Sequence, residues 1–175
     1  MKKRGQIWIS VAMYTALGVI LVTLILSVGM PFVNKLKARN TVLQTKNVMY
    51  DLDGVIRTVS NEGFGSKRPV FVDIGEGDFS IRDNRISWKM VTEEKLGIEP
   101  NVDKECENEG ALIIKEGGLN ICSEQLGQGY EINLYLDYKD EVDIRSTLKT
   151  LSGKYNLVIE HKVSVNGESY IEIRG

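Results

Sequence analysis

The sequence predicts an α+β chain: a long N-terminal membrane and spine helix, followed by a small, mainly antiparallel β domain. Three observations lead to this fold class. Gln6–Val33 is a run of 28 residues without Asp, Glu, Lys or Arg. Beyond it, apolar residues recur at helical spacings to about Ser60, and from Pro69 they alternate with polar residues, which is the period of a strand. We therefore expect a transmembrane and amphipathic helix over residues 6–60 and a β-rich head domain over 65–175.

The uncharged run is long enough to cross a bilayer. About 20 apolar residues span a hydrocarbon core about 30 Å thick, and a charged side chain at its centre costs about 2.5 to 3.5 kcal/mol. Basic residues flank the run on both sides, Lys2, Lys3 and Arg4 before it and Lys35, Lys37 and Arg39 after it. Because the two flanks are equally basic, the positive-inside rule does not orient the span.

Three kinds of membrane segment compete for this run. A secretory signal has an apolar core of about 7 to 15 residues and a small-residue cleavage site. This core is longer, although Ser27-Val28-Gly29 imitates such a site. A plain single-pass anchor requires nothing further of the flanks. The third kind is a leader that is cut ahead of the run, and the residues before Gln6 favour it.

Lys2-Lys3-Arg4-Gly5-Gln6 forms a very short basic leader that ends in Gly directly before the apolar helix. This start resembles the class III signal peptide of type IV pilins and archaeal pilin-like proteins. In that family a prepilin peptidase cuts after the Gly, so the resemblance implies a leader over residues 1–5 and cleavage between Gly5 and Gln6. Many pilins carry Glu at the fifth position after the cut. This chain has Ser10 there, and many archaeal members also lack that Glu.

The resemblance implies a pilin-like fold and a structural subunit of a type IV pilus-like filament or pseudopilus. It also implies a cytoplasmic N-terminus and an extracytoplasmic head, which reaches the cell surface after assembly. The expected partners are the membrane, the prepilin peptidase, copies of the chain or related pilins, and the pilus assembly machinery. The alternative is a non-polymerising, single-pass membrane-anchored module whose extracytoplasmic domain binds a surface partner.

Small residues in the run predict close packing between helices. Ala12 and Ala16 form a small-x-x-x-small pair, and Gly18 and Gly29 add further points of close approach. Ala and Gly are also common in membrane helices of every kind. Pro31 removes one backbone donor, so we expect the helix to bend there without having to stop.

The second half of the helix is predicted to be amphipathic. Its polar face carries Lys35, Arg39, Lys46 and Arg57, and its apolar face carries Leu36, Leu43, Leu52, Val55, Ile56 and Val59. At 1.5 Å per residue, a helix over 6–60 is about 80 Å long, far longer than a bilayer is thick. The outer half must therefore pack against something, and the resemblance implies the β domain of the same subunit.

Hairpins account for most of the predicted head. Residues 79–82 and 85–90 are joined by Asp83-Asn84, 111–115 and 119–122 by Glu116-Gly117-Gly118, and 155–165 and 169–174 by Asn166-Gly167. Further strands are expected over 70–74 and 130–138. Asp140–Leu151 is predicted to be a short helix.

Charge divides the chain in two. Residues 1–59 hold eight Lys or Arg and two Asp, a net charge of +6, whereas residues 60–175 hold 14 basic and 22 acidic residues, a net charge of −8. The basic residues of the head are interspersed with carboxylates and do not cluster as they do on a phosphate-binding face. We therefore expect no nucleic-acid partner.

The two cysteines are candidates for a disulfide. Acidic neighbours of Cys106 disfavour its thiolate, and Cys122 lies in a predicted strand. A bond between them would close a loop of about 15 residues and stabilise by about 3 kcal/mol in the chain-entropy model. Two free thiols are the alternative. No metal site is expected, because His161 would add only a third ligand.

Catalysis has little support in the sequence. The motif around Asp51 and Asp53 resembles the nucleophile motif of haloacid dehalogenase-type phosphatases, and Gly77-Asp78 imitates the metal-binding pair of that family. Too few residues separate the two for the crossovers of that fold. We expect both aspartates to be solvated helix positions, His161 to be a solvated strand residue, and the protein to be neither an enzyme nor dependent on a cofactor.

Overall fold

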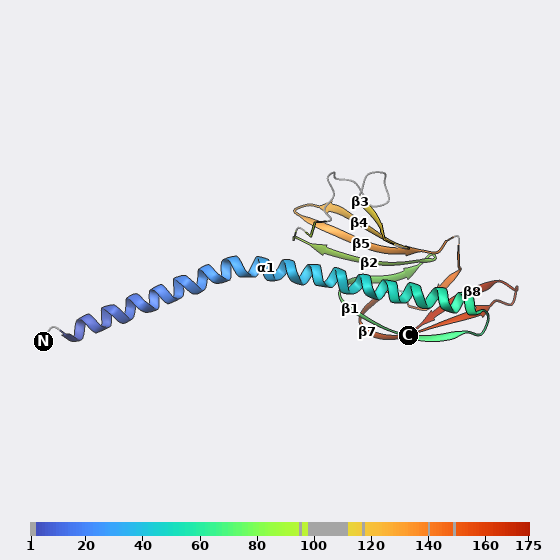
Figure 1. The fold of residues 1–175 in the computed structure, drawn as a ribbon, viewed down its shortest axis with the longest axis horizontal. Helices are drawn as coiled ribbons and strands as arrows, with labels where there is room; N and C mark the ends of the chain where they lie inside the picture. Colours follow the sequence, from blue (N-terminus) through green and yellow to red (C-terminus); the bar gives the residue numbers. More distant parts are fainter. Residues whose placement is uncertain (1–2, 95, 98–111, 117, 140, 149) are drawn as a thin grey trace. The chain divides into compact units, whose positions relative to one another are not determined.

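The structure, a computed structural model of the 175-residue chain, describes residues 3–94, 96–97, 112–116, 118–139, 141–148 and 150–175. One long N-terminal helix is followed by a mainly antiparallel, curled sheet, an α+β layout (Figure 1). This confirms the predicted succession of a helix and a β-rich domain. The chain divides into two compact units, Met1–Lys37 and Ala38–Gly175, so the boundary falls inside the helix and not at its end.

Helix α1 spans Lys3–Glu62. It begins three residues before the predicted start and ends two residues after the predicted end, and Pro31 lies inside it without ending it. Gly63 follows with a φ of 87°, the left-handed conformation that commonly ends a helix and that Gly adopts without strain. The segment after Glu62, with Gly63 and Gly65 at positive φ, therefore terminates the helix.

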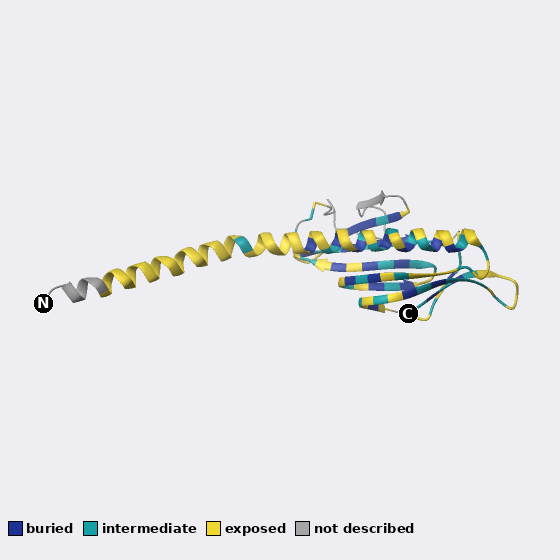
Figure 2. Ribbon diagram, turned by 60° about the horizontal axis from the view of Figure 1, so that its bottom comes forward, coloured by how far each residue is buried: buried dark blue, intermediate teal, exposed yellow. Residues whose placement is uncertain are grey.

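Within the second unit, α1 buries a single stripe of side chains against the sheet (Figure 2). Its members lie three or four residues apart: Ala38, Val42, Thr45, Met49, Leu52, Ile56 and Val59. The predicted apolar face was right for the last three of these. It was wrong for Leu36 and Leu43, which are 44% and 47% exposed, because a continuous stripe through Leu52 and Ile56 reaches Val42 and Thr45 instead.

Among the described residues, eight strands form one sheet in the order β3-β4-β5-β2-β1-β7-β8-β6. Their bounds are β1 Lys67–Arg82, β2 Arg85–Thr92, β3 Leu112–Glu116, β4 Leu119–Leu126, β5 Gly129–Asp137, β6 Ile144–Ser146, β7 Thr150–Val163 and β8 Ser169–Arg174. Neighbouring strands are antiparallel except β6 and β8, which are parallel. The three predicted hairpins are thus present as β1–β2, β3–β4 and β7–β8.

Strand β1 pairs with β2 on one side and with β7 on the other. Residues 70–74 and 79–82, predicted as separate strands, belong to this one strand, whose register with β7 shifts between Ile74 and Phe79. At the shift, Trp88 Nε1 donates a hydrogen bond of 2.8 Å to the carbonyl of Glu76. Gly77 has a φ of 91°, and a Cβ there would lie 2.6 Å from Trp88 Nε1, so the bulge requires Gly.

The predicted helix over Asp140–Leu151 is wrong. The described part of this segment contains β6 and the start of β7. Ile144 is buried and its backbone N–H donates to Asn84 Oδ1 at 2.8 Å, while β8 supplies a parallel partner strand. Tertiary pairing therefore outweighs the weak helical spacing of the apolar residues in this segment.

Asp83 and Asn84 form the β1–β2 turn with φ angles of 51° and 60°. The sequence predicts a turn at these two residues, and positive φ at both central residues is the requirement of a type I′ hairpin. The β7–β8 connection is longer than a two-residue turn. Ser164 N donates to Glu168 O at 2.7 Å, and Asn166 and Gly167 lie inside the loop that this bond closes.

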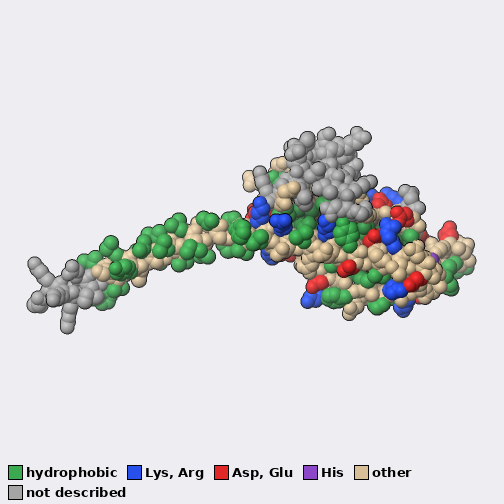
Figure 3. Space-filling view, viewed as in Figure 1, with side chains coloured by type: hydrophobic (Ala, Val, Ile, Leu, Met, Phe, Trp, Pro, Cys, Tyr) green, Lys and Arg blue, Asp and Glu red, His purple; other side chains and the backbone are tan. Residues whose placement is uncertain are grey.

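The outer face of the sheet carries ion pairs between neighbouring strands. Lys162 Nζ lies 2.6 Å from Glu172 Oε2 on β7 and β8, and Lys89 Nζ lies 3.1 Å from Glu131 Oε1 on β2 and β5. Basic and acidic side chains are accordingly mixed on the visible surface of the head (Figure 3). Such partly exposed pairs contribute little stability each, and the face they form is a solvated one.

Candidate functional site

The first candidate surface is the apolar part of α1. From Trp8 to Val33 every side chain is exposed except Gly29, which is intermediate (Figures 2 and 3). Among the described residues, this helix is long and apolar enough to cross a membrane. An apolar helix that is exposed all round has to be covered by lipid or by other protein.

Hydroxyl groups in this segment find partners within the helix itself. Thr15 Oγ1 donates to the carbonyl of Ala12 at 2.9 Å, Thr23 Oγ1 to that of Val19 at 2.8 Å, and Ser27 Oγ to that of Leu24 at 2.9 Å. An unpaired hydroxyl in an apolar environment costs several kcal/mol on alkane transfer scales. These three hydroxyls therefore do not oppose burial in lipid or between helices.

The small residues predicted for helix packing occupy two faces. Ala12 and Ala16 are four residues apart and share one face, whereas Gly18, two residues beyond Ala16, does not. Gly18 aligns instead with Gly29, because eleven residues complete about three turns. A Cβ added at either glycine would meet nothing within 4 Å.

The leader residues are described only in part. Lys3, Arg4, Gly5 and Gln6 lie in the first turns of α1, and Lys2 lies outside the described residues. Cleavage between Gly5 and Gln6 stays a prediction.

A second candidate is a polar cluster that connects α1 to the segment after β5. Arg57 Nε donates to both carboxylate oxygens of Asp53, at 3.0 and 2.9 Å, and Arg57 Nη1 donates to Glu141 Oε2 at 2.8 Å. Tyr138 Oη donates to Asp53 Oδ1 at 2.8 Å. Asp53 is therefore not the solvated helix position that the sequence predicts. Asp51, which is exposed, is one.

Burial and the neighbouring Asp53 shift the ionisation of this cluster. Loss of water around its phenol, followed by the hydrogen bond to Asp53, raises the pKa of Tyr138 far above its ordinary value of 10.0. The hydrogen bond to Asp53 raises the pKa of Arg57. Tyr138 thus stays a neutral donor and Arg57 stays a cation, so their contacts with Asp53 and Glu141 hold the helix in place.

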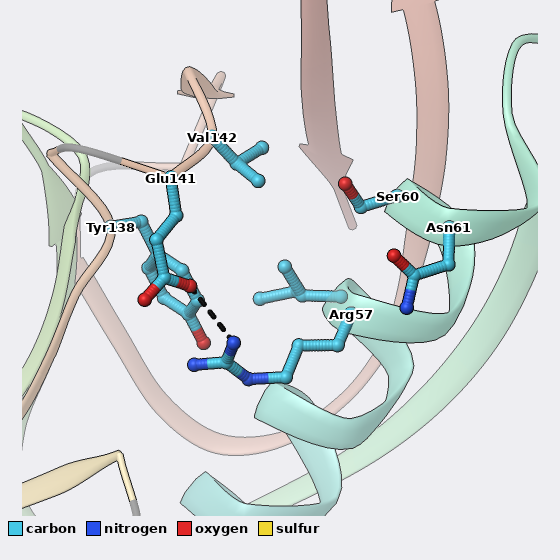
Figure 4. Close-up of a pocket in the computed structure, with 7 residues that line it drawn as sticks. Arg57, Ser60, Asn61, Tyr138, Glu141 and Val142 are labelled. Carbon is cyan, nitrogen blue, oxygen red and sulfur yellow. Dashed lines mark hydrogen bonds and ion pairs between the residues drawn. The ribbon is translucent and has the colours of Figure 1, made fainter.

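A pocket of about 200 Å³ opens beside the cluster. Its lining residues are Ile56, Arg57, Ser60, Asn61, Tyr138, Glu141 and Val142. In Figure 4 the guanidinium of Arg57 points toward the carboxylate of Glu141, across the opening from Ser60 and Asn61 on the helix. The two charged lining residues, Arg57 and Glu141, form an ion pair with each other.

His161 contacts the end of the helix. Its Nδ1 lies 3.3 Å from the carbonyl oxygen of Val59, and its Nε2 contacts Ser169 Oγ. Helix carbonyls in the last turn lack partners within the helix, so His161 satisfies one of them. His161 is half-buried, so it is less solvated than expected: it lies on the same face of β7 as the buried Leu157 and Ile159, and its contact with Ser169 is exposed.

Cys122 is fully buried on β4 and is disulfide-bonded. Cys106 lies outside the described residues, so its pairing with Cys122 stays a prediction. In the part of the chain that the structure describes, no three His, Cys, Asp or Glu side chains form a group able to hold a metal ion.

Comparisons with known proteins add no relative. No family model, no curated protein and no solved structure matches the chain.

Proposed function

We propose that this protein is a structural subunit of a type IV pilus-like filament or pseudopilus. The leader resembles the signal that a prepilin peptidase cuts, and this peptidase would remove residues 1–5. Subunits would then assemble through the apolar part of α1. The supporting observation is the surface of that helix, exposed and apolar all round over residues 8–33. Membrane insertion covers this surface before assembly, and neighbouring copies cover it afterwards.

Gly18 and Gly29 suggest which face approaches a neighbour most closely. Gly in the middle of a helix destabilises it by about 0.5 to 1 kcal/mol relative to Ala. Nothing within the subunit occupies the space where a Cβ would lie at either position. A second helix that approaches along this face gives a reason for both glycines.

Firm attachment of α1 to the head fits the same function. Force along a filament passes from one subunit to the next through helix packing, and each helix must then hold its own head. The stripe from Ala38 to Val59, the contacts of Asp53 and Arg57, and His161 provide this attachment.

Processing is the first test. The mature chain, coexpressed with a prepilin peptidase, is expected to begin at Gln6 in N-terminal sequencing. Gly5→Val should block the cut, because a tight backbone approach at the cleaved bond admits only a small residue. Ser27→Val is the matched control and should leave cleavage intact. A mature chain that begins at Met1, or beyond Gly29, would contradict the proposal.

Assembly is the second test. Gly18→Leu with Gly29→Leu keeps the span apolar, and overpacking typically costs about 1 to 3 kcal/mol per site where helices touch. This variant should be processed but remain a membrane-held monomer without filaments. Ala12→Leu with Ala16→Leu examines the other face, and Ile20→Leu is the conservative control.

Electron microscopy and crosslinking separate the two candidate functions. A filament subunit should lose assembly in at least one of the two double variants and keep it with Ile20→Leu. The membrane-anchored binding module predicts the same oligomeric state for the unmodified chain and all three variants, because lipid accepts Leu as readily as Gly or Ala.

A further inference from the structure

Asn166 and Gly167 lie in the connection between β7 and β8. Asn166 is exposed, and its neighbour Val165 is fully exposed, so water reaches the tip of this loop. Such tips open locally more readily than the strands that flank them. Gly167 has a φ of 83° and no Cβ, so its backbone nitrogen is the least hindered of any that follows an asparagine in the described residues.

We infer that Asn166 is a site of spontaneous deamidation, a covalent modification that requires only water. The backbone nitrogen of Gly167 attacks Cγ of Asn166. The new N–Cγ bond closes a five-membered imide, the Cγ–Nδ2 bond breaks, and the amide leaves as ammonia with the proton that the Gly167 nitrogen gives up. Water then opens the imide at either carbonyl to yield aspartate or isoaspartate, with no change in oxidation state.

The loop restrains this reaction in the folded chain. Gly167 N donates a hydrogen bond of 2.9 Å to the carbonyl of Ser164, and attack requires that bond to open. Conversion is therefore slower in the folded protein than in the unfolded chain. It remains faster than at asparagines whose following nitrogen lies in a strand. Asn156 is the internal comparison, since it is exposed as well but precedes Leu157 in the middle of β7.

The products change the loop in two ways. Either one adds a negative charge two residues from Glu168. Isoaspartate also adds a carbon to the backbone inside the loop that the Ser164–Glu168 hydrogen bond closes, so that bond of 2.7 Å cannot keep its geometry. Deamidation thus marks the age of a chain at one exposed loop.

Peptide mass spectrometry of the full chain, incubated in detergent at mildly alkaline pH, tests this inference. Asn166 should convert severalfold faster than Asn156, and urea should accelerate its conversion. Asn166→Gln should abolish the modification at this position, because the corresponding six-membered imide forms far more slowly. Earlier conversion of Asn156, or an Asn166 that converts no faster than the strand asparagine, would overturn it.

Discussion

The two halves of α1 form one continuous helix and yet keep opposite kinds of surface. Between Trp8 and Val33 apolar side chains surround the helix and are exposed, whereas from Ala38 onward one mainly apolar stripe is buried. The contrast shows that helical geometry does not decide what a helix packs against. A helix that is apolar all round must be covered by lipid or by other protein, whereas a single apolar stripe can be buried against the chain's own sheet.

The largest effect is expected from comparing two truncated chains, one that keeps the second half of α1 and one that lacks the helix. A chain from Ala38 to Gly175 should be soluble and cooperatively folded, because it contains the whole second unit. A chain from Gly65 lacks the buried helix stripe and leaves the inner face of the sheet uncovered, so it should aggregate or stay unfolded. Circular dichroism and gel filtration of the two chains check this, and a folded monomer from Gly65 would show that the helix is not part of the core.

Single substitutions in the two halves of α1 should differ in their effect on the stability of the head. Ile56 is fully buried, and Ile56→Ala is expected to lower the free energy of unfolding of the head by about 2 to 5 kcal/mol. Leu24 is 58% exposed, and Leu24→Ala should leave the head unchanged. Urea denaturation of the full chain in detergent, followed by tryptophan fluorescence from buried Trp88, measures both. Equal losses would contradict the division of α1 into two halves.

Tyr138 should contribute about 1 kcal/mol through its hydrogen bond to Asp53. The pKa of Tyr138 is raised in the folded state by burial and by Asp53. Its contribution is therefore fully present below the unfolded pKa of about 10 and is lost as the pH rises above it. The stability difference between the unmodified chain and Tyr138→Phe should be constant from neutral pH to about pH 9 and should shrink in stronger alkali. A difference that grows in alkali would contradict the assignment.

The smallest expected effect is a gain in stability at Gly54. This glycine lies within α1 in the second unit, is exposed, and has open space where a Cβ would lie. Gly54→Ala should stabilise the head by about 0.5 to 1 kcal/mol. Gly77→Ala is the contrasting variant, because its added Cβ would meet Trp88 at a positive φ, and it should destabilise. Thermal unfolding of the two variants measures both changes.

Local patterns predicted much of this architecture correctly. An uncharged run, a helical period and a strand period each depend on residues close in the chain, and they located α1 and the three hairpins. Asp83-Asn84 predicted its turn because the requirement for positive φ is also local.

The sequence by itself determined that the chain has one long helix with an apolar first half, that β strands follow it, and that one turn lies at Asp83-Asn84. Only the tertiary structure decided that Val42 and Thr45 are buried in place of Leu43. It also decided that β6 replaces the expected helix after Asp140, and that Asp53, Arg57, Tyr138 and Glu141 meet. The physical reason is distance along the chain. Tyr138 and Asp53 are 85 residues apart, and no periodicity within either segment records a partner so remote.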